Sequence, residues 1–117
     1  MEKFLLLLRE DYAIREKMTP EAREISIQAM MEWIESLDRS GNYLKSEPLS
    51  RAGSYVSKDY VLSDGPFIES KEAISGYMMI NAENLEQATS IVRTCPLVLN
   101  DGYIMEVRPV GQKSCRE

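Results

Sequence analysis

Five blocks of apolar and polar positions along the chain predict a mixed α+β domain. Residues 4–8 and 76–80 are almost unbroken apolar runs of strand length, typical of strands that are buried on both faces. Residues 20–40 and 84–95 instead repeat apolar residues at helical spacing. Residues 103–109 alternate apolar and charged side chains, as a half-buried strand does.

The residue types at the ends of the two helical blocks agree with this prediction. Thr19 and Pro20 are typical of the cap and first position of a helix, and Asn84 with Gln87 forms a weak capping-box pattern. The first helix has an apolar arc for the core and an acidic arc for solvent. The apolar arc comprises Ala29, Met30, Trp33, Ile34 and Leu37.

The segments between these blocks are shorter. Residues 9–18 are polar and are interpreted as a connection, and residues 43–49 as an edge strand or extended loop that contains a proline near its end. Residues 54–56 and 60–62 predict a hairpin with a polar turn. Residues 64–67 predict a turn, because Asp bonds its own backbone, Gly tolerates a positive φ and Pro fixes φ.

The order strand, helix, strand, hairpin, strand, helix, strand predicts a ferredoxin-like split βαβ fold. In that fold an antiparallel sheet carries both helices on one face. A chain of 117 residues suffices for one domain, which we assign to residues 1–111. The polar residues 112–117 are expected to form a disordered tail.

Composition excludes several classes of function. The formal net charge of −5 argues against nucleic acid as a partner. The chain has no histidine, which excludes histidine-dependent catalysis and imidazole-bound metals. No glycine-rich turn opens either helix, so no nucleotide cofactor is predicted.

Cysteine usage and hydropathy bear on location. Cys95 and Cys115 are too few and too far apart for a disulfide framework or a zinc site, and Cys95 is expected to be a small buried residue. No apolar segment is long enough for a signal peptide or a membrane span. Free thiols fit a cytoplasmic protein.

Several motifs follow one another in the second half of the chain. Residues 64–72 read DGPFIESKE, Gly76-Tyr77 lie in a strand, Cys95-Pro96 end a helix, and residues 106–110 read EVRPV. Together they resemble the DGPF group of the YCII-related proteins, and the resemblance extends over nearly the whole chain. It implies a dimeric α+β barrel, in which two ferredoxin-like sheets pack face to face.

Physical reasoning also favours a homodimer. With both helices on one side of the sheet, the other side of the two apolar strands would be exposed in a monomer.

The chain departs from the family pattern in two ways. Many YCII-related proteins carry a His paired with an Asp as the proposed catalytic unit, and this chain has no His. The family's Gly-Gly before the aromatic residue is Ser75-Gly76 here.

The last predicted strand supplies two charged residues to a candidate site. Met105 and Val107 are expected to face the helices, so strand alternation places Glu106 and Arg108 on the opposite face. Charges there are costly unless they are paired or line a wet cleft. If the family geometry holds, the loop that resembles the signature lies near this cleft.

The predicted ligand-binding residues combine that loop with the last strand: Asp64, Glu69, Lys71, Glu106 and Arg108. Arg108 would anchor an anion through two hydrogen bonds, and Asp64 or Glu69 would act as a general base if desolvation raises its pKa. No metal site is predicted, although Asp64, Glu69 and Glu106 offer oxygen ligands of the kind that Mg²⁺ and Ca²⁺ take.

The sequence leaves two functions open. In the first, the protein binds a small polar or anionic molecule between the sheet and the DGPF loop, with enzymatic activity undecided. In the second, it is a non-enzymatic accessory or regulatory protein, since relatives that resemble this group are often encoded beside alternative sigma factors. The charged residues then have structural roles: Asp64 caps its own turn, and Glu106 and Arg108 form ion pairs across the dimer.

Overall fold

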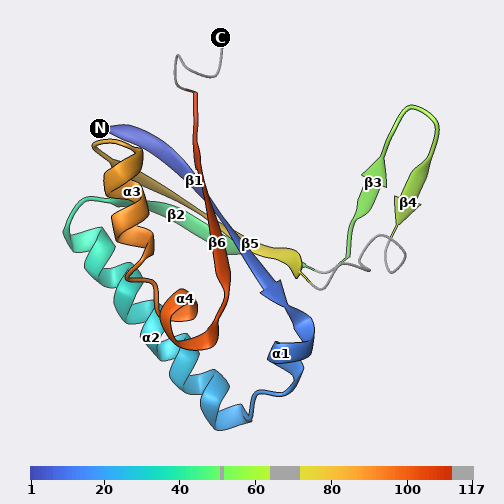
Figure 1. Cartoon of the computed structure of the whole chain (residues 1–117), viewed down its shortest axis with the longest axis horizontal. Coiled ribbons are helices and arrows are strands. Elements are labelled where there is room, and N and C mark those ends of the chain that lie inside the picture. Colours follow the sequence, from blue (N-terminus) through green and yellow to red (C-terminus); the bar gives the residue numbers. More distant parts are fainter. Residues whose placement is uncertain (51, 64–71, 112–117) are drawn as a thin grey trace.

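The computed structural model describes residues 1–50, 52–63 and 72–111. Its largest element is a four-stranded antiparallel sheet (Figure 1). The strand order is β2-β5-β1-β6. The strands are β1 (Glu2–Asp11), β2 (Tyr43–Pro48), β5 (Glu72–Ala82) and β6 (Ile104–Pro109). This order and direction are those of the ferredoxin-like split βαβ fold, so the predicted α+β class is confirmed.

The helices lie on one face of this sheet (Figure 1). They are α1 (Tyr12–Glu16), α2 (Pro20–Arg39), α3 (Leu85–Val92) and α4 (Pro96–Asp101). None of the helices in the described part of the chain has the length and apolar character needed to cross a bilayer.

The two longer helices begin where their cap residues predict. The Thr19 hydroxyl accepts a hydrogen bond from the Ala22 amide at 3.0 Å, and the Asn84 side chain accepts one from the Gln87 amide at 2.8 Å. After α2, Gly41 adopts a positive φ of 80°, which is the usual conformation just beyond a helix end.

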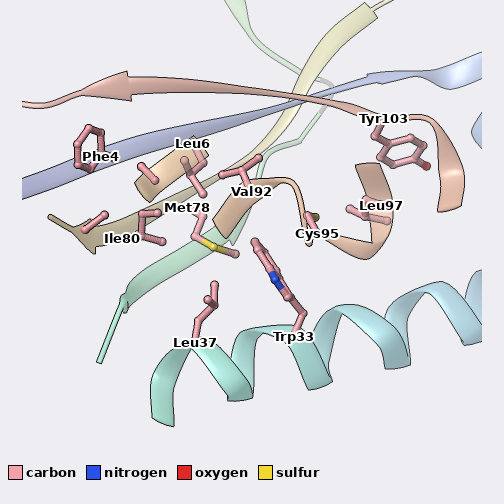
Figure 2. Close-up of a cluster of buried hydrophobic side chains, with 12 residues drawn as sticks. Phe4, Leu6, Trp33, Leu37, Met78, Ile80, Val92, Cys95, Leu97 and Tyr103 are labelled. Atoms are coloured by element: carbon pink, nitrogen blue, oxygen red, sulfur yellow. The ribbon is translucent and has the colours of Figure 1, made fainter. Parts of the chain in front are cut away.

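The core lies between the sheet and the helices (Figure 2). Trp33 on α2 and Cys95 before α4 are both buried, as predicted. Met105 and Val107 of β6 pack against the same cluster, which confirms the predicted facing of that strand. The buried apolar residues are Phe4, Leu6, Trp33, Leu37, Met78, Ile80, Ala82, Ala88, Val92, Cys95, Leu97 and Tyr103.

The strand β1 shows how the two sheet faces differ. Phe4 and Leu6 are fully buried against the helices, whereas Leu5 and Leu7 on the other face are only half-buried. The sequence predicted that this strand is buried on both faces. In the single chain only the face toward the helices is fully buried.

Two segments differ from the sequence prediction. Residues 9–18 are not a simple connection, because β1 continues to Asp11 and α1 follows, capped by the Asp11 carboxylate at 2.9 Å from the Ala13 amide. The polar residues at the end of β1 did not indicate a strand. Glu10 can nevertheless be buried there because its carboxylate pairs with Arg15. The second predicted helix ends earlier, at Val92, and α4 is an additional helix that starts at Pro96.

The predicted hairpin is present as β3 (Ser54–Val56) and β4 (Val61–Ser63). It stands away from the four-stranded sheet (Figure 1). The predicted DGPF turn at 64–67 and the predicted tail at 112–117 lie outside the described residues.

Candidate functional site

The charged cluster predicted from the sequence is described in part. Asp64, Glu69 and Lys71 lie outside the described residues, so the loop half of that site stays a prediction. Glu106 and Arg108 lie on β6 and face away from the core, as strand alternation predicts.

Glu106 is the acceptor for two guanidinium groups. Its Oε1 accepts from Arg9 Nε at 3.0 Å and from Arg9 Nη2 at 2.8 Å, and its Oε2 accepts from Arg108 Nη1 at 2.8 Å. The hydrogen bonds from Arg108 and Arg9 hold the pKa of Glu106 below its ordinary value. A carboxylate so firmly ionised is a poor proton acceptor, which favours the structural role for this pair.

Arg9 is the residue of this cluster that sequence reasoning missed. On β1 it pairs with Ile104, one step along the same face from the pair Leu7 and Glu106. The signal was strand register: an antiparallel pairing of the first and last strands places residues on one face diagonally within reach of long side chains.

A cavity of about 490 Å³ lies on the helix side of the sheet, on the other face from Glu106. Its walls are largely apolar and come from β1, α2 and α4, with Leu8, Met30, Ile34 and Leu97 among them. A smaller cavity of about 150 Å³ shares Leu8, Met30 and Ile34 with it. We call the larger space the Glu10 cavity. Its volume falls within the range of roughly 300–1,000 Å³ that is usual for small-molecule sites.

Three buried polar side chains line this cavity on or next to three neighbouring strands of the sheet. Ser75 belongs to β5, Glu10 to the central strand β1, and Tyr103 immediately precedes β6. All three are buried, with 8%, 5% and 8% of their surface exposed, respectively. The sheet therefore brings together polar groups that are far apart in the sequence.

A β-bulge places Ser75 in the cavity. Leu8 pairs with Gly76 and Arg9 pairs with Ile74, so Ser75 is an extra residue without a partner on β1. A bulge of this kind redirects a side chain relative to simple alternation, and Ser75 lines the helix side of the sheet. Gly76 beside it allows close approach of β2, since a Cβ there would lie 3.3 Å from the Glu47 carbonyl oxygen.

The Ser75 hydroxyl oxygen is buried and has no hydrogen-bond partner; within the described residues no other buried side-chain oxygen or nitrogen lacks one. Buried hydroxyls are nearly always paired, and leaving one unpaired costs roughly 1–3 kcal/mol. The cavity next to it is large enough to hold the missing partner.

Glu10 and Tyr103 define the polar end of the cavity. The Glu10 carboxylate accepts a hydrogen bond from Arg15 Nη1 of α1 at 2.9 Å, which supplies the counter-charge that lets it be buried. Burial, followed by the charge of nearby Glu10, raises the pKa of Tyr103 above its ordinary value. The phenol is therefore a protonated donor at neutral pH.

Sequence reasoning missed this cavity, although part of its signal was present. In β1 the even-numbered residues Phe4, Leu6 and Leu8 face the core, and the same alternation places Glu10 on the core side. The bulge at Ser75 and the position of Arg15 depend on tertiary structure and left no such signal.

Across residues 1–50, 52–63 and 72–111, no group of three or more Cys, Asp or Glu side chains is arranged to hold a metal ion. The carboxylates of Asp64 and Glu69 fall outside those ranges.

Comparison with known proteins identifies the family. No curated protein matches the chain. The sequence model of the YCII-related domain matches residues 4–112, nearly the whole chain and including both β1 and β6. The protein therefore belongs to the YCII-related domain family.

Proposed function

We propose that this YCII-related protein binds a small molecule in the Glu10 cavity. The observation that carries the proposal is the buried Ser75 hydroxyl, which has no partner and lines a cavity of about 490 Å³. Apolar walls with a few convergent polar groups are the usual composition of a ligand site.

The proposal is one of binding. A serine becomes a nucleophile when a neighbouring base takes its proton, and the Ser75 hydroxyl has no hydrogen-bond partner. Glu10 is hydrogen-bonded to Arg15. These contacts fit groups that orient a ligand. The DGPF-loop site with Asp64, Glu69 and Lys71 remains a separate prediction.

We also propose that the protein acts as a homodimer through the face of the sheet opposite the helices. Six apolar residues lie on this helix-free face: Leu5, Leu7, Ile74, Tyr77, Met79 and Ile104. Polar groups lie on the two outer strands: Glu106 and Arg108 on β6, bonded to Arg9 of β1, and Glu47 on β2, which accepts a hydrogen bond of 3.2 Å from Tyr77 of β5. An apolar centre with a polar rim is the usual anatomy of an interface.

Two variants of α2 test the location of the ligand. Ile27 lines the Glu10 cavity and is 48% exposed, whereas Ile25 on the same helix is 71% exposed and does not line it. A fragment library is screened by thermal shift, and hits are mapped by the methyl resonances of Met30 and Ile34. We expect Ile27→Trp to abolish binding by filling the cavity and Ile25→Trp to leave it unchanged.

Ser75→Ala is the second variant, with Ser90→Ala on the exposed side of α3 as its control. Loss of the hydroxyl should weaken a hit that contacts it by about 1 kcal/mol. The proposal fails if no fragment binds, or if hits shift resonances of Leu5 and Met79 on the helix-free face and leave those of Met30 and Ile34 unchanged.

A further inference from the structure

The polar end of the Glu10 cavity is rich in hydrogen-bond donors. Arg15 and Arg23 line it together with the Tyr103 ring, and both arginines extend to the solvent side, which places them at the mouth. Arg15 uses one nitrogen, Nη1, for Glu10. A guanidinium has five N–H donors, so further donors of Arg15 are available to a ligand.

The charges at this end leave one cation without a partner. Glu10 is paired with Arg15. Asp101 lies near Tyr103, but its Oδ2 accepts from Ser26 at 2.8 Å, and it does not line the cavity. Arg23, in the first turns of α2, has no ion pair or hydrogen bond from its side chain within the described ranges of the chain.

The opposite end of the cavity is apolar. Met30 and Ile34, which lie further along α2 than Arg23, form its wall, and methionine side chains adapt to ligands of different shape. A ligand that fills the space therefore needs an apolar body at one end and, at the other, a group that accepts several hydrogen bonds and carries negative charge.

We propose that the ligand of the Glu10 cavity is a small carboxylate with an apolar body, whose carboxylate is bound by Arg23, Arg15 and the Tyr103 hydroxyl. This inference rests on the proposed function. Guanidinium and phenol donors match a carboxylate, because its two oxygens accept several charge-assisted hydrogen bonds. Two arginines and one carboxylate, Arg15, Arg23 and Glu10, line this end, so its charge is net positive and favours an anionic group.

A matched series of probes tests this directly: 3-phenylpropanoate, 3-phenylpropanamide and 3-phenylpropylamine, which share one apolar body and differ in charge. Binding is measured by calorimetry and by the methyl resonances of Met30 and Ile34. We expect the dissociation constant of the carboxylate to be at least about tenfold lower than that of the amide, because its hydrogen bonds are charge-assisted. The amine should bind weakest.

Variants assign the carboxylate to its residues. Arg23→Gln and Tyr103→Phe should each weaken binding of the carboxylate by about tenfold and leave the amide unchanged. Arg93→Gln is the control for net charge, because Arg93 is an exposed arginine on the C-terminal side of α3 and does not line the cavity. It should have no effect on either probe.

The outcomes separate this inference from the proposed function. If the amide or the amine binds in the cavity as tightly as the carboxylate, the cavity is a ligand site and the inference of an anionic ligand is overturned. The same holds if Arg23→Gln and Arg93→Gln behave alike. If none of the three probes binds and the fragment screen also fails, both proposals fall.

Discussion

The two glutamates that form ion pairs on the two faces of the sheet, Glu106 and Glu10, differ in burial and in the number of arginines that they contact. Glu106 on the helix-free face is half-exposed and balanced by two arginines, whereas Glu10 on the helix side is buried and has Arg15 as its ion-pair partner. Alternation along the strands placed Glu106 and Arg108 correctly, because it needs only the period of two. It could not identify Arg9 as a partner of Glu106 or Arg15 as the partner of Glu10, since those contacts depend on strand pairing and on the path of α1.

The pH dependence of stability tests the role of Glu106. Its pKa lies below the ordinary value of 4.5, so its contribution is present above about pH 4.5 and is lost as the pH falls through the pKa of the folded state. The melting temperature of Glu106→Gln should therefore lie below that of the wild type at pH 7, and the difference should shrink as the pH falls below about 4.5.

The control for this prediction is Glu35→Gln, which removes an exposed pair with Arg39 at 3.2 Å on α2. Such surface pairs contribute little. A difference between Glu106→Gln and the wild type that stayed constant from pH 7 to pH 3 would contradict the assignment.

Trp33 is the residue for which sequence and structure agree best. It is 8% exposed in the core, and its indole Nε1 donates to the Thr94 hydroxyl at 2.8 Å (Figure 2 shows its ring between α2 and Cys95). Trp33→Ala should destabilise the fold by about 3–5 kcal/mol in urea unfolding followed by circular dichroism. Met31→Ala on the exposed side of α2 should cost far less. Native fluorescence resembling that of free tryptophan would contradict this placement.

Among the helices and strands, the features that depend on local residues could be predicted from the sequence. The starts of α2 and α3 follow from Thr19 and Asn84, whose side chains accept hydrogen bonds from the first turn. The extension of β1 through Glu10 and the bulge at Ser75 were missed. Both depend on what the neighbouring strand or helix provides, and the same two features line the Glu10 cavity.

The β3–β4 hairpin should be the least stable of the described strands. It has two short strands, and its apolar side chains Tyr55, Val56, Tyr60 and Val61 are all exposed. An isolated two-stranded hairpin is marginally stable in water. In hydrogen exchange, we expect its amides to exchange much faster than those of β1 and β5, which pair on the central sheet. Equal protection of the hairpin and β1 would contradict this expectation.

The whole molecule presents two different sheet faces, and this difference links fold to assembly. The helices cover one face and line the Glu10 cavity, whereas no helix of the described residues covers the six apolar residues of the helix-free face. The sequence predicted this asymmetry from the apolar runs at β1 and β5. The polar residues around this face could not be predicted, because only strand register brings Arg9 next to Glu106 and Glu47 next to Tyr77.

Dimer formation through the helix-free face is tested by Leu5→Arg. Leu5 pairs with Met79 on one side and Arg108 on the other, so an arginine there would introduce charge at the apolar centre beside an existing cation. Because Leu5 is only half-buried in the single chain, the fold should persist. In sedimentation equilibrium we expect a dimer for the wild type, with a dissociation constant raised at least about thirtyfold in the variant, the equivalent of roughly 2 kcal/mol. Ile25→Arg, on the exposed surface of α2, adds the same charge away from this face and should remain dimeric. A wild-type protein that is monomeric at micromolar concentration, or a Leu5→Arg variant that dimerises as well as Ile25→Arg, would refute the proposed interface.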